Sequence, residues 1–140
     1  MLKFGTSGLR GLVTELTGRQ CYLYTTAFLQ YFLDKKLIKK NCSVALAGDL
    51  RPSTERILKA VAAAIKDFGC QADYGGIIPT PAVSLYGFRR NIPSVMVTGS
   101  HIPLDRNGIK FNLPSGEILK KDEQAITEYY EKISAGNNFN

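Results

Sequence analysis

The chain has 140 residues, of which 44% are hydrophobic and 21% are charged, a balance that suits one domain with its own core. Its net charge is +6, but the basic residues do not alternate with aromatic residues along a strand, so we expect no nucleic-acid partner. The longest apolar run is far too short to cross a bilayer, and no signal peptide follows Met1. These features predict a cytoplasmic protein with no membrane partner.

Three cysteines, Cys21, Cys42 and Cys70, are far apart in the sequence and show no CxxC spacing. Their odd number and apolar neighbours predict three reduced, buried thiols. Because the chain has one histidine, a zinc site built from Cys and His ligands is not expected.

The predicted elements alternate between helices and strands after an opening glycine-rich loop over 4–11. Apolar periodicity and turn residues predict helices over 18–38, 57–68, 82–89 and 121–134, and strands over 43–47, 70–74, 93–98 and 108–112. The last strand is expected to be antiparallel to its predecessor, because the connection between them is short.

This order of elements predicts an α/β fold: a three-layer α/β/α domain with a mixed, mainly parallel four-stranded sheet. The domain is expected to cover residues 1–135. Residues 136–140 are interpreted as a frayed tail or as a linker to further domains.

The strongest candidate site follows the strand that ends at Thr98 and Gly99. Ser100 comes next, then the only histidine, His101, and Lys110 lies on the following strand. A nucleophilic hydroxyl, an imidazole and an ammonium within one excursion of the chain are what phosphoryl transfer to and from a serine needs. Structural roles for His101 and Lys110 are the alternatives. A serine hydrolase is disfavoured, because the sequence is not Gly-x-Ser-x-Gly and a strand rather than a helix follows.

Two further places at loop positions carry charged side chains. Arg10 lies in the opening loop, where a guanidinium could grip a phosphate, although a plain tight turn is the alternative. Asp49 and Arg51 lie at a strand-to-helix junction, and we expect them to form a structural ion pair or to cap the helix.

Four blocks together resemble the α-D-phosphohexomutase family, which includes phosphomannomutase and phosphoglucomutase. They are Phe4–Gly11, Gly48–Ser53, Pro79–Pro81 and Thr98–Lys110, and they come in the family's order. The family usually has asparagine where this chain has Ile102.

The resemblance implies site roles for individual residues. Ser100 would be the phosphorylated serine, which donates and recovers phosphate and binds Mg²⁺ in its phosphorylated form. Lys110 and His101 would assist proton transfer, and Arg10 would line the active site. The remaining Mg²⁺ ligands are expected in an absent domain, because the chain has no Asp-Gly-Asp run.

The resemblance also implies an activity: intramolecular phosphotransfer between the 1 and 6 positions of a hexose phosphate, through a hexose 1,6-bisphosphate, in an isomerase. The chain resembles only the N-terminal domain of four. Its partners would therefore be hexose phosphates and the other domains of the same parent chain, and the fragment alone is expected to be inactive. The alternative is a non-catalytic phosphate-binding or anion-binding α/β module.

Overall fold

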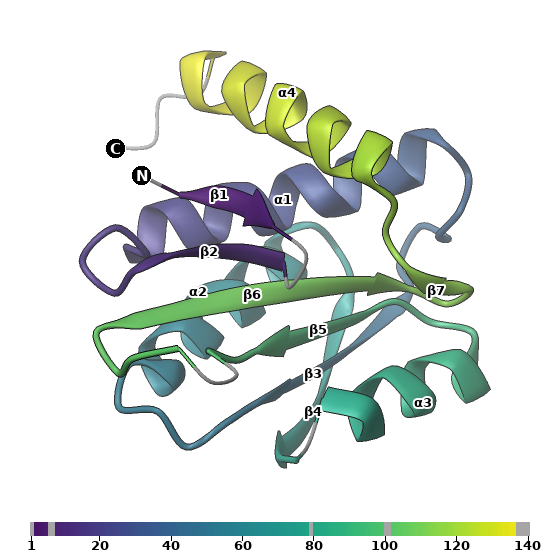
Figure 1. Cartoon of the computed structure of the whole chain (residues 1–140). Coiled ribbons are helices and arrows are strands. Elements are labelled where there is room, and N and C mark those ends of the chain that lie inside the picture. Colours follow the sequence, from purple (N-terminus) through teal and green to yellow (C-terminus); the bar gives the residue numbers. More distant parts are fainter. Residues whose placement is uncertain (1, 6–7, 79, 100–101, 137–140) are drawn as a thin grey trace.

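The computed structural model describes residues 2–5, 8–78, 80–99 and 102–136. A single sheet lies between two helical layers (Figure 1). One face packs against α1 (Gly18–Asp34), α2 (Thr54–Asp67) and α4 (Lys120–Gly136), and the other face packs against α3 (Thr80–Arg90). The predicted three-layer α/β/α arrangement is confirmed.

Over the described residues the sheet is mixed, as predicted, but it has seven strands rather than four, and it has more antiparallel than parallel pairings instead of being mainly parallel. They are β1 (Lys3–Gly5), β2 (Gly8–Leu12), β3 (Ser43–Gly48), β4 (Gln71–Ile77), β5 (Ser94–Val97), β6 (Arg106–Leu113) and β7 (Gly116–Glu117). Their order is β1-β2-β6-β5-β3-β4, and β7 pairs with β6. β3 is parallel to β4 and β5, whereas the other four pairings are antiparallel, including the predicted β5–β6 pair.

The opening segment differs from the predicted loop, because β1 and β2 form a hairpin at the edge of the sheet (Figure 1). β2 pairs antiparallel with β6, with Leu9 opposite Ile109 and Arg10 opposite Gly108. Leu9 is fully buried, and this long-range pairing stabilises a segment whose glycines are local signals for a loop. The hairpin therefore holds Arg10 at a fixed position in the sheet.

The helices fall close to their predicted ranges, with one clear difference at the end of α1. The helix ends at Asp34 instead of 38, because Lys36 adopts a left-handed conformation with φ 60°. At the other end of the chain, α4 reaches Gly136, so the proposed boundary between 1–135 and 136–140 stays a prediction.

The larger core cluster lies between the sheet and the layer of α1, α2 and α4. Phe28 of α1 stacks on Phe111 of β6, with ring centroids 4.6 Å apart. Along β5, Val95 and Val97 enter this cluster, whereas Met96 packs with α3 on the opposite face. This alternation assigns each site residue on β5 and β6 to a face of the sheet.

All three cysteines are free, as expected; Cys21 and Cys70 are buried and Cys42 is half-buried. Within the described ranges, none of the helices has the length and apolar character that a bilayer-spanning segment requires.

Candidate active site at the ends of β3 and β5

The C-terminal ends of the parallel strands β3 and β5 lie side by side. Gly48 is opposite Val97, and the backbone N–H of Asp49 donates to the carbonyl of Val97 at 3.1 Å. The chain that follows β5 is also tied to this junction, because the N–H of Gly99 donates to Asp49 Oδ2 at 3.1 Å. The second and fourth sequence blocks therefore meet at one edge of the sheet, as the rule for parallel strands predicts.

The Asp49 carboxylate organises this junction by accepting several hydrogen bonds. Thr54 Oγ1 donates to Oδ1 at 2.7 Å, and the backbone N–H of Arg51 donates to the same oxygen at 3.1 Å. Partial burial alone would raise the pKa of Asp49, but hydrogen bonds from Thr54, Arg51, Gly99 and Thr98 lower it below its ordinary value. Asp49 is therefore a charged structural anchor.

Arg51 holds the loop after β5 through three backbone carbonyls. Its Nη2 donates to Ile102 O at 2.6 Å, and its Nη1 donates to Pro103 O at 2.8 Å and Arg106 O at 3.1 Å. Its Nε lies 3.4 Å from Asp49 Oδ2, which confirms the predicted ion pair, and the Arg51 side chain is only 9% exposed. We call this set of contacts the arginine clamp.

Two glycines leave room for the arginine side chains. A Cβ at Gly99 would lie 2.2 Å from Cζ of Arg51, so any larger residue would displace the clamp. A Cβ at Gly108 would lie 3.0 Å from Cγ of Arg10, which crosses β6 at that point. The glycines of the loop block therefore permit close approach of the Arg51 guanidinium and of the aliphatic part of the Arg10 side chain.

Arg10 reaches the same loop from β2. Its Nη1 donates to the carbonyl of Gly99 at 3.1 Å, directly before Ser100 in the chain. Partial burial lowers the pKa of Arg10, and the positive charges of Arg51 and Arg106 lower it further. The positive charges of Arg51 and Arg106 therefore act on Arg10, and this local excess of positive charge favours an anion.

Lys110 lies on the same face of the sheet as Arg10. Gly108, the partner of Arg10, is two residues before Lys110 on β6, so the two cationic side chains are diagonal neighbours. Lys110 Nζ contacts Glu117 Oε1 at 2.7 Å, and the two side chains are 23% and 69% exposed. Because Glu117 is largely exposed, solvent screens this pair, and it contributes at most about 1 kcal/mol. A phosphate could therefore replace Glu117 as the partner of Lys110.

Ser100 and His101 lie outside the described residues, as do Pro79 of the third block and two residues of the opening block. The flanks of Ser100 and His101 are held together, since the N–H of Ile102 donates to the carbonyl of Gly99 at 3.0 Å. Their predicted roles in phosphate and proton transfer stay predictions.

The described residues do not fit a magnesium site. Among them, no group of three or more His, Cys, Asp or Glu side chains could hold a metal ion. Asp49, the acidic residue at the junction, already accepts hydrogen bonds at both carboxylate oxygens. The predicted Mg²⁺ ligands other than phospho-Ser100 would therefore have to come from outside the described part of the chain.

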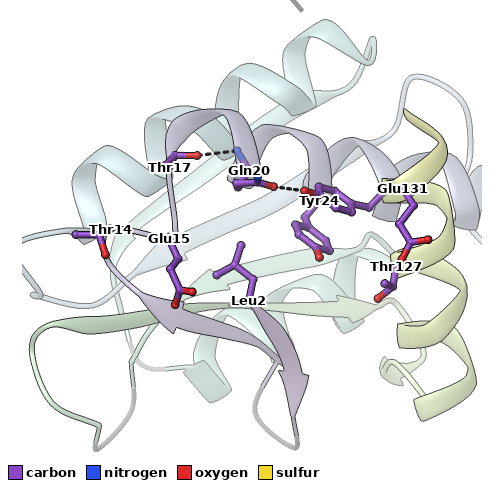
Figure 2. A pocket seen from close by; sticks show the side chains of 9 residues that line it. Leu2, Thr14, Glu15, Thr17, Gln20, Tyr24, Thr127 and Glu131 are labelled. Carbon is purple, nitrogen blue, oxygen red and sulfur yellow. Dashed lines mark hydrogen bonds between the residues drawn. The ribbon is translucent and has the colours of Figure 1, made fainter. Parts of the chain in front are cut away.

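A separate pocket of about 520 Å³ lies between the N-terminal hairpin, α1 and α4 (Figure 2). Neither Arg10 nor Lys110, the two predicted site residues that the structure describes, lines it. Figure 2 shows Leu2 projecting into the space. The Tyr130 hydroxyl of α4 donates a hydrogen bond to Gln20 Oε1 of α1 and so joins the two helices. This pocket is therefore distinct from the junction of β3 and β5.

Comparison with known proteins decides the family. The sequence profile of the phosphoglucomutase/phosphomannomutase α/β/α domain I matches residues 1–137. This chain belongs to the phosphoglucomutase/phosphomannomutase family. Its resemblance to the α-D-phosphohexomutases is thereby confirmed.

Two relatives within this family are phosphomannomutases. The one from Sinorhizobium fredii is 52% identical over 134 residues, which is 95% of this chain and 28% of the relative. The one from Salmonella muenchen is 47% identical over 125 residues, covering 89% of this chain and 26% of the relative. The chain thus spans little more than a quarter of the length of either relative.

A solved structure shows that the fold is shared within the family. A phosphoglucomutase/phosphomannomutase family protein from Burkholderia thailandensis superposes with a TM-score of 0.79 at 23% identity, covering 96% of this chain and 31% of that one.

The local sequence predicted a structural role for Arg51 but not its contacts with the loop after β5, and it did not point to Arg106. Both contacts depend on residues more than fifty positions apart, for which the sequence carries no local signal.

Proposed function

We propose that this chain is the phosphoserine-bearing domain of a hexose-phosphate mutase, with Ser100 as the phosphate carrier. The whole protein would move phosphate between the 1 and 6 positions of a hexose through a hexose 1,6-bisphosphate. The observation that carries the proposal is the convergence of Arg10 and Arg51 on the backbone carbonyls of Gly99 and Ile102, which flank Ser100 and His101 in the chain. The similarity to two phosphomannomutases supports the same reaction class.

The proposed phosphate transfer can be written with every broken and formed bond accounted for. The bond between phosphorus and the Ser100 oxygen breaks, and a bond between phosphorus and a hexose hydroxyl oxygen forms. The hydroxyl proton passes to a base, and the released Ser100 oxygen takes up a proton from an acid. The reverse transfer at the other sugar position restores phospho-Ser100. Arg10 would stabilise the phosphate charge, and Lys110 and His101 would carry the proton.

A bound Mg²⁺ would supply further charge neutralisation at the phosphate. Because the described residues do not form a site for it, we assign its ligands to phospho-Ser100 and to other domains of the same parent chain. For the same reason the isolated 140-residue chain is expected to lack mutase turnover. A cytoplasmic location and the absence of a nucleic-acid partner stay predictions.

The test is phosphorylation of the full-length protein that carries this sequence. After incubation with glucose 1,6-bisphosphate, intact-mass analysis should show one phosphate adduct, which Ser100→Ala abolishes. Ser115→Ala, a change at an exposed turn serine between β6 and β7, is the matched control and should keep the adduct. An adduct that persists in Ser100→Ala would refute the role of Ser100.

Turnover of glucose 1-phosphate and mannose 1-phosphate tests the cationic residues in the same protein. Lys110→Ala should lower kcat by about 100-fold or more, as expected for loss of a proton-transfer group. Glu117→Gln removes the competing partner of Lys110 and should leave kcat at or above the wild-type value. Equal losses from both variants would show that the ion pair has a structural role only.

The second candidate is a phosphate-binding or anion-binding module without catalysis, which the local excess of positive charge around Arg10 also suits. It predicts binding of hexose phosphate without a Ser100 adduct and without turnover. Turnover of the full-length protein that Ser100→Ala abolishes would exclude it.

A further inference from the structure

Cys42 and Cys70 lie next to each other although 28 positions separate them in the sequence. Their Sγ atoms are 3.7 Å apart. Cys70 is 8% exposed, whereas Cys42 is half-buried and therefore reachable from solvent. The third thiol, Cys21, is fully buried in helix α1.

The sheet brings the two cysteines together, because each directly precedes one of two paired strands. Ser43 of β3 is opposite Gln71 of β4 in a parallel ladder, and the N–H of Gln71 donates to the carbonyl of Cys42 at 3.1 Å. Adjacent strands lie about 4.8 Å apart. That spacing falls within the Cα separation of about 4.4–6.8 Å that disulfides span.

The side chains also have a suitable direction. Residues opposite each other in a parallel ladder point to the same face, and both thiols contact the core cluster beneath α2. A disulfide requires a sulfur separation of about 2.05 Å, so rotation of the two side chains suffices to close the remaining gap.

We propose that Cys42 and Cys70 are a dithiol modification site that closes to an intramolecular disulfide when a small disulfide such as oxidised glutathione is supplied. The Cys42 thiolate attacks one glutathione sulfur, and the first glutathione leaves as a thiolate. The Cys70 thiolate then attacks the Cys42 sulfur and releases the second glutathione. Two protein thiols lose two electrons and two protons, and one oxidised glutathione becomes two reduced molecules.

Burial raises the pKa of Cys42 to about 12, and the neighbouring Cys70 contributes to the shift. Because the thiolate is the attacking species, closure is slow, and the pair stays reduced under brief exposure to oxidant. The site therefore behaves as a durable crosslink rather than as a fast sensor.

The crosslink lies at the opposite end of β3 from the arginine clamp. β3 covers six residues, Ser43–Gly48, which places the sulfur atoms about 20 Å from Asp49. The disulfide would join the edge strand β4 to β3 and lower the conformational entropy of the unfolded chain. We expect a gain in thermal stability and no change at the junction of β3 and β5.

The experiment uses the 140-residue chain incubated with excess oxidised glutathione for hours. Alkylation and mass analysis should show that accessible thiols in the unfolded protein fall from three to one, with the Cys42 and Cys70 peptides linked. The melting temperature should rise by about 10 °C and return on reduction.

Variants separate this pair from non-specific oxidation. Cys42→Ser and Cys70→Ser should each abolish the linked peptide and the rise in melting temperature, and circular dichroism of the reduced variants checks folding. Cys21→Ala is the matched control and should keep both. Three free thiols after prolonged oxidation, a disulfide between two chains, or loss of the link in Cys21→Ala would overturn the proposal.

Discussion

Replacing Arg51 by alanine removes the arginine clamp and should destabilise the domain measurably. The side chain is 9% exposed and donates hydrogen bonds to the carbonyls of Ile102, Pro103 and Arg106. Hydrogen bonds from charged donors contribute about 1.5–3 kcal/mol each, but these carbonyls lie near the surface and can bind water after the change. At about 1 kcal/mol per bond, the free energy of unfolding should fall by about 3 kcal/mol.

For a chain of 140 residues, the unfolding entropy is about 0.3 kcal/mol/K, so this loss lowers the melting temperature by about 10 °C. Differential scanning calorimetry and urea denaturation of the chain measure it. Arg89→Ala, at an exposed position on α3, is the matched control and should stay within about 0.5 kcal/mol of wild type. An Arg51→Ala protein as stable as the Arg89→Ala control would refute the clamp as a source of stability.

Three further predictions concern neighbouring contacts. Gly99→Ala places a Cβ 2.2 Å from the clamp's guanidinium and should cost about 2 kcal/mol in urea denaturation, whereas Gly18→Ala, with no atom within 4 Å, should cost nothing. Asp49 has a pKa lowered by folding, so its charge stabilises the fold above about pH 4 and this contribution is lost as pH falls through the folded pKa. Asp49→Asn should therefore be less stable than wild type at pH 7 by about 2 kcal/mol, and calorimetry should show that this difference in stability becomes smaller below about pH 4. A difference that does not change with pH would contradict the lowered pKa of Asp49. Tyr31→Phe deletes a 3.0 Å hydrogen bond to the buried Asp122 and should lower the melting temperature by about 5 °C, and an unchanged value would show that the bond contributes nothing.

Local sequence signals predicted the helices and the central strands. The rule that ligands bind beyond the C-terminal ends of parallel strands accounts for the meeting of Asp49 with Gly99, which a 3.1 Å hydrogen bond joins. The ion pair of Asp49 and Arg51 also followed from their position at a strand-to-helix junction.

The remaining features depend on partners that are distant in the sequence. The β1–β2 hairpin has glycines that weaken its local strand pattern, and only pairing with β6 reveals it. The contact of Cys42 with Cys70 arises from the parallel register of β3 and β4, which cysteine spacing does not encode. Arg51 binds backbone carbonyls, which every residue has, so no pattern of side chains in the sequence predicts the clamp.

The same property has a consequence at Ile102, where the resemblance to the family implied an asparagine. The contact made by Arg51 at this position is to the main-chain oxygen of Ile102. A hydrogen bond to a backbone carbonyl does not depend on the side chain of the residue that accepts it. Even a proline accepts one, as Pro103 does. An exchange between a polar and an aliphatic side chain at position 102 should therefore leave this contact with the loop after β5 intact.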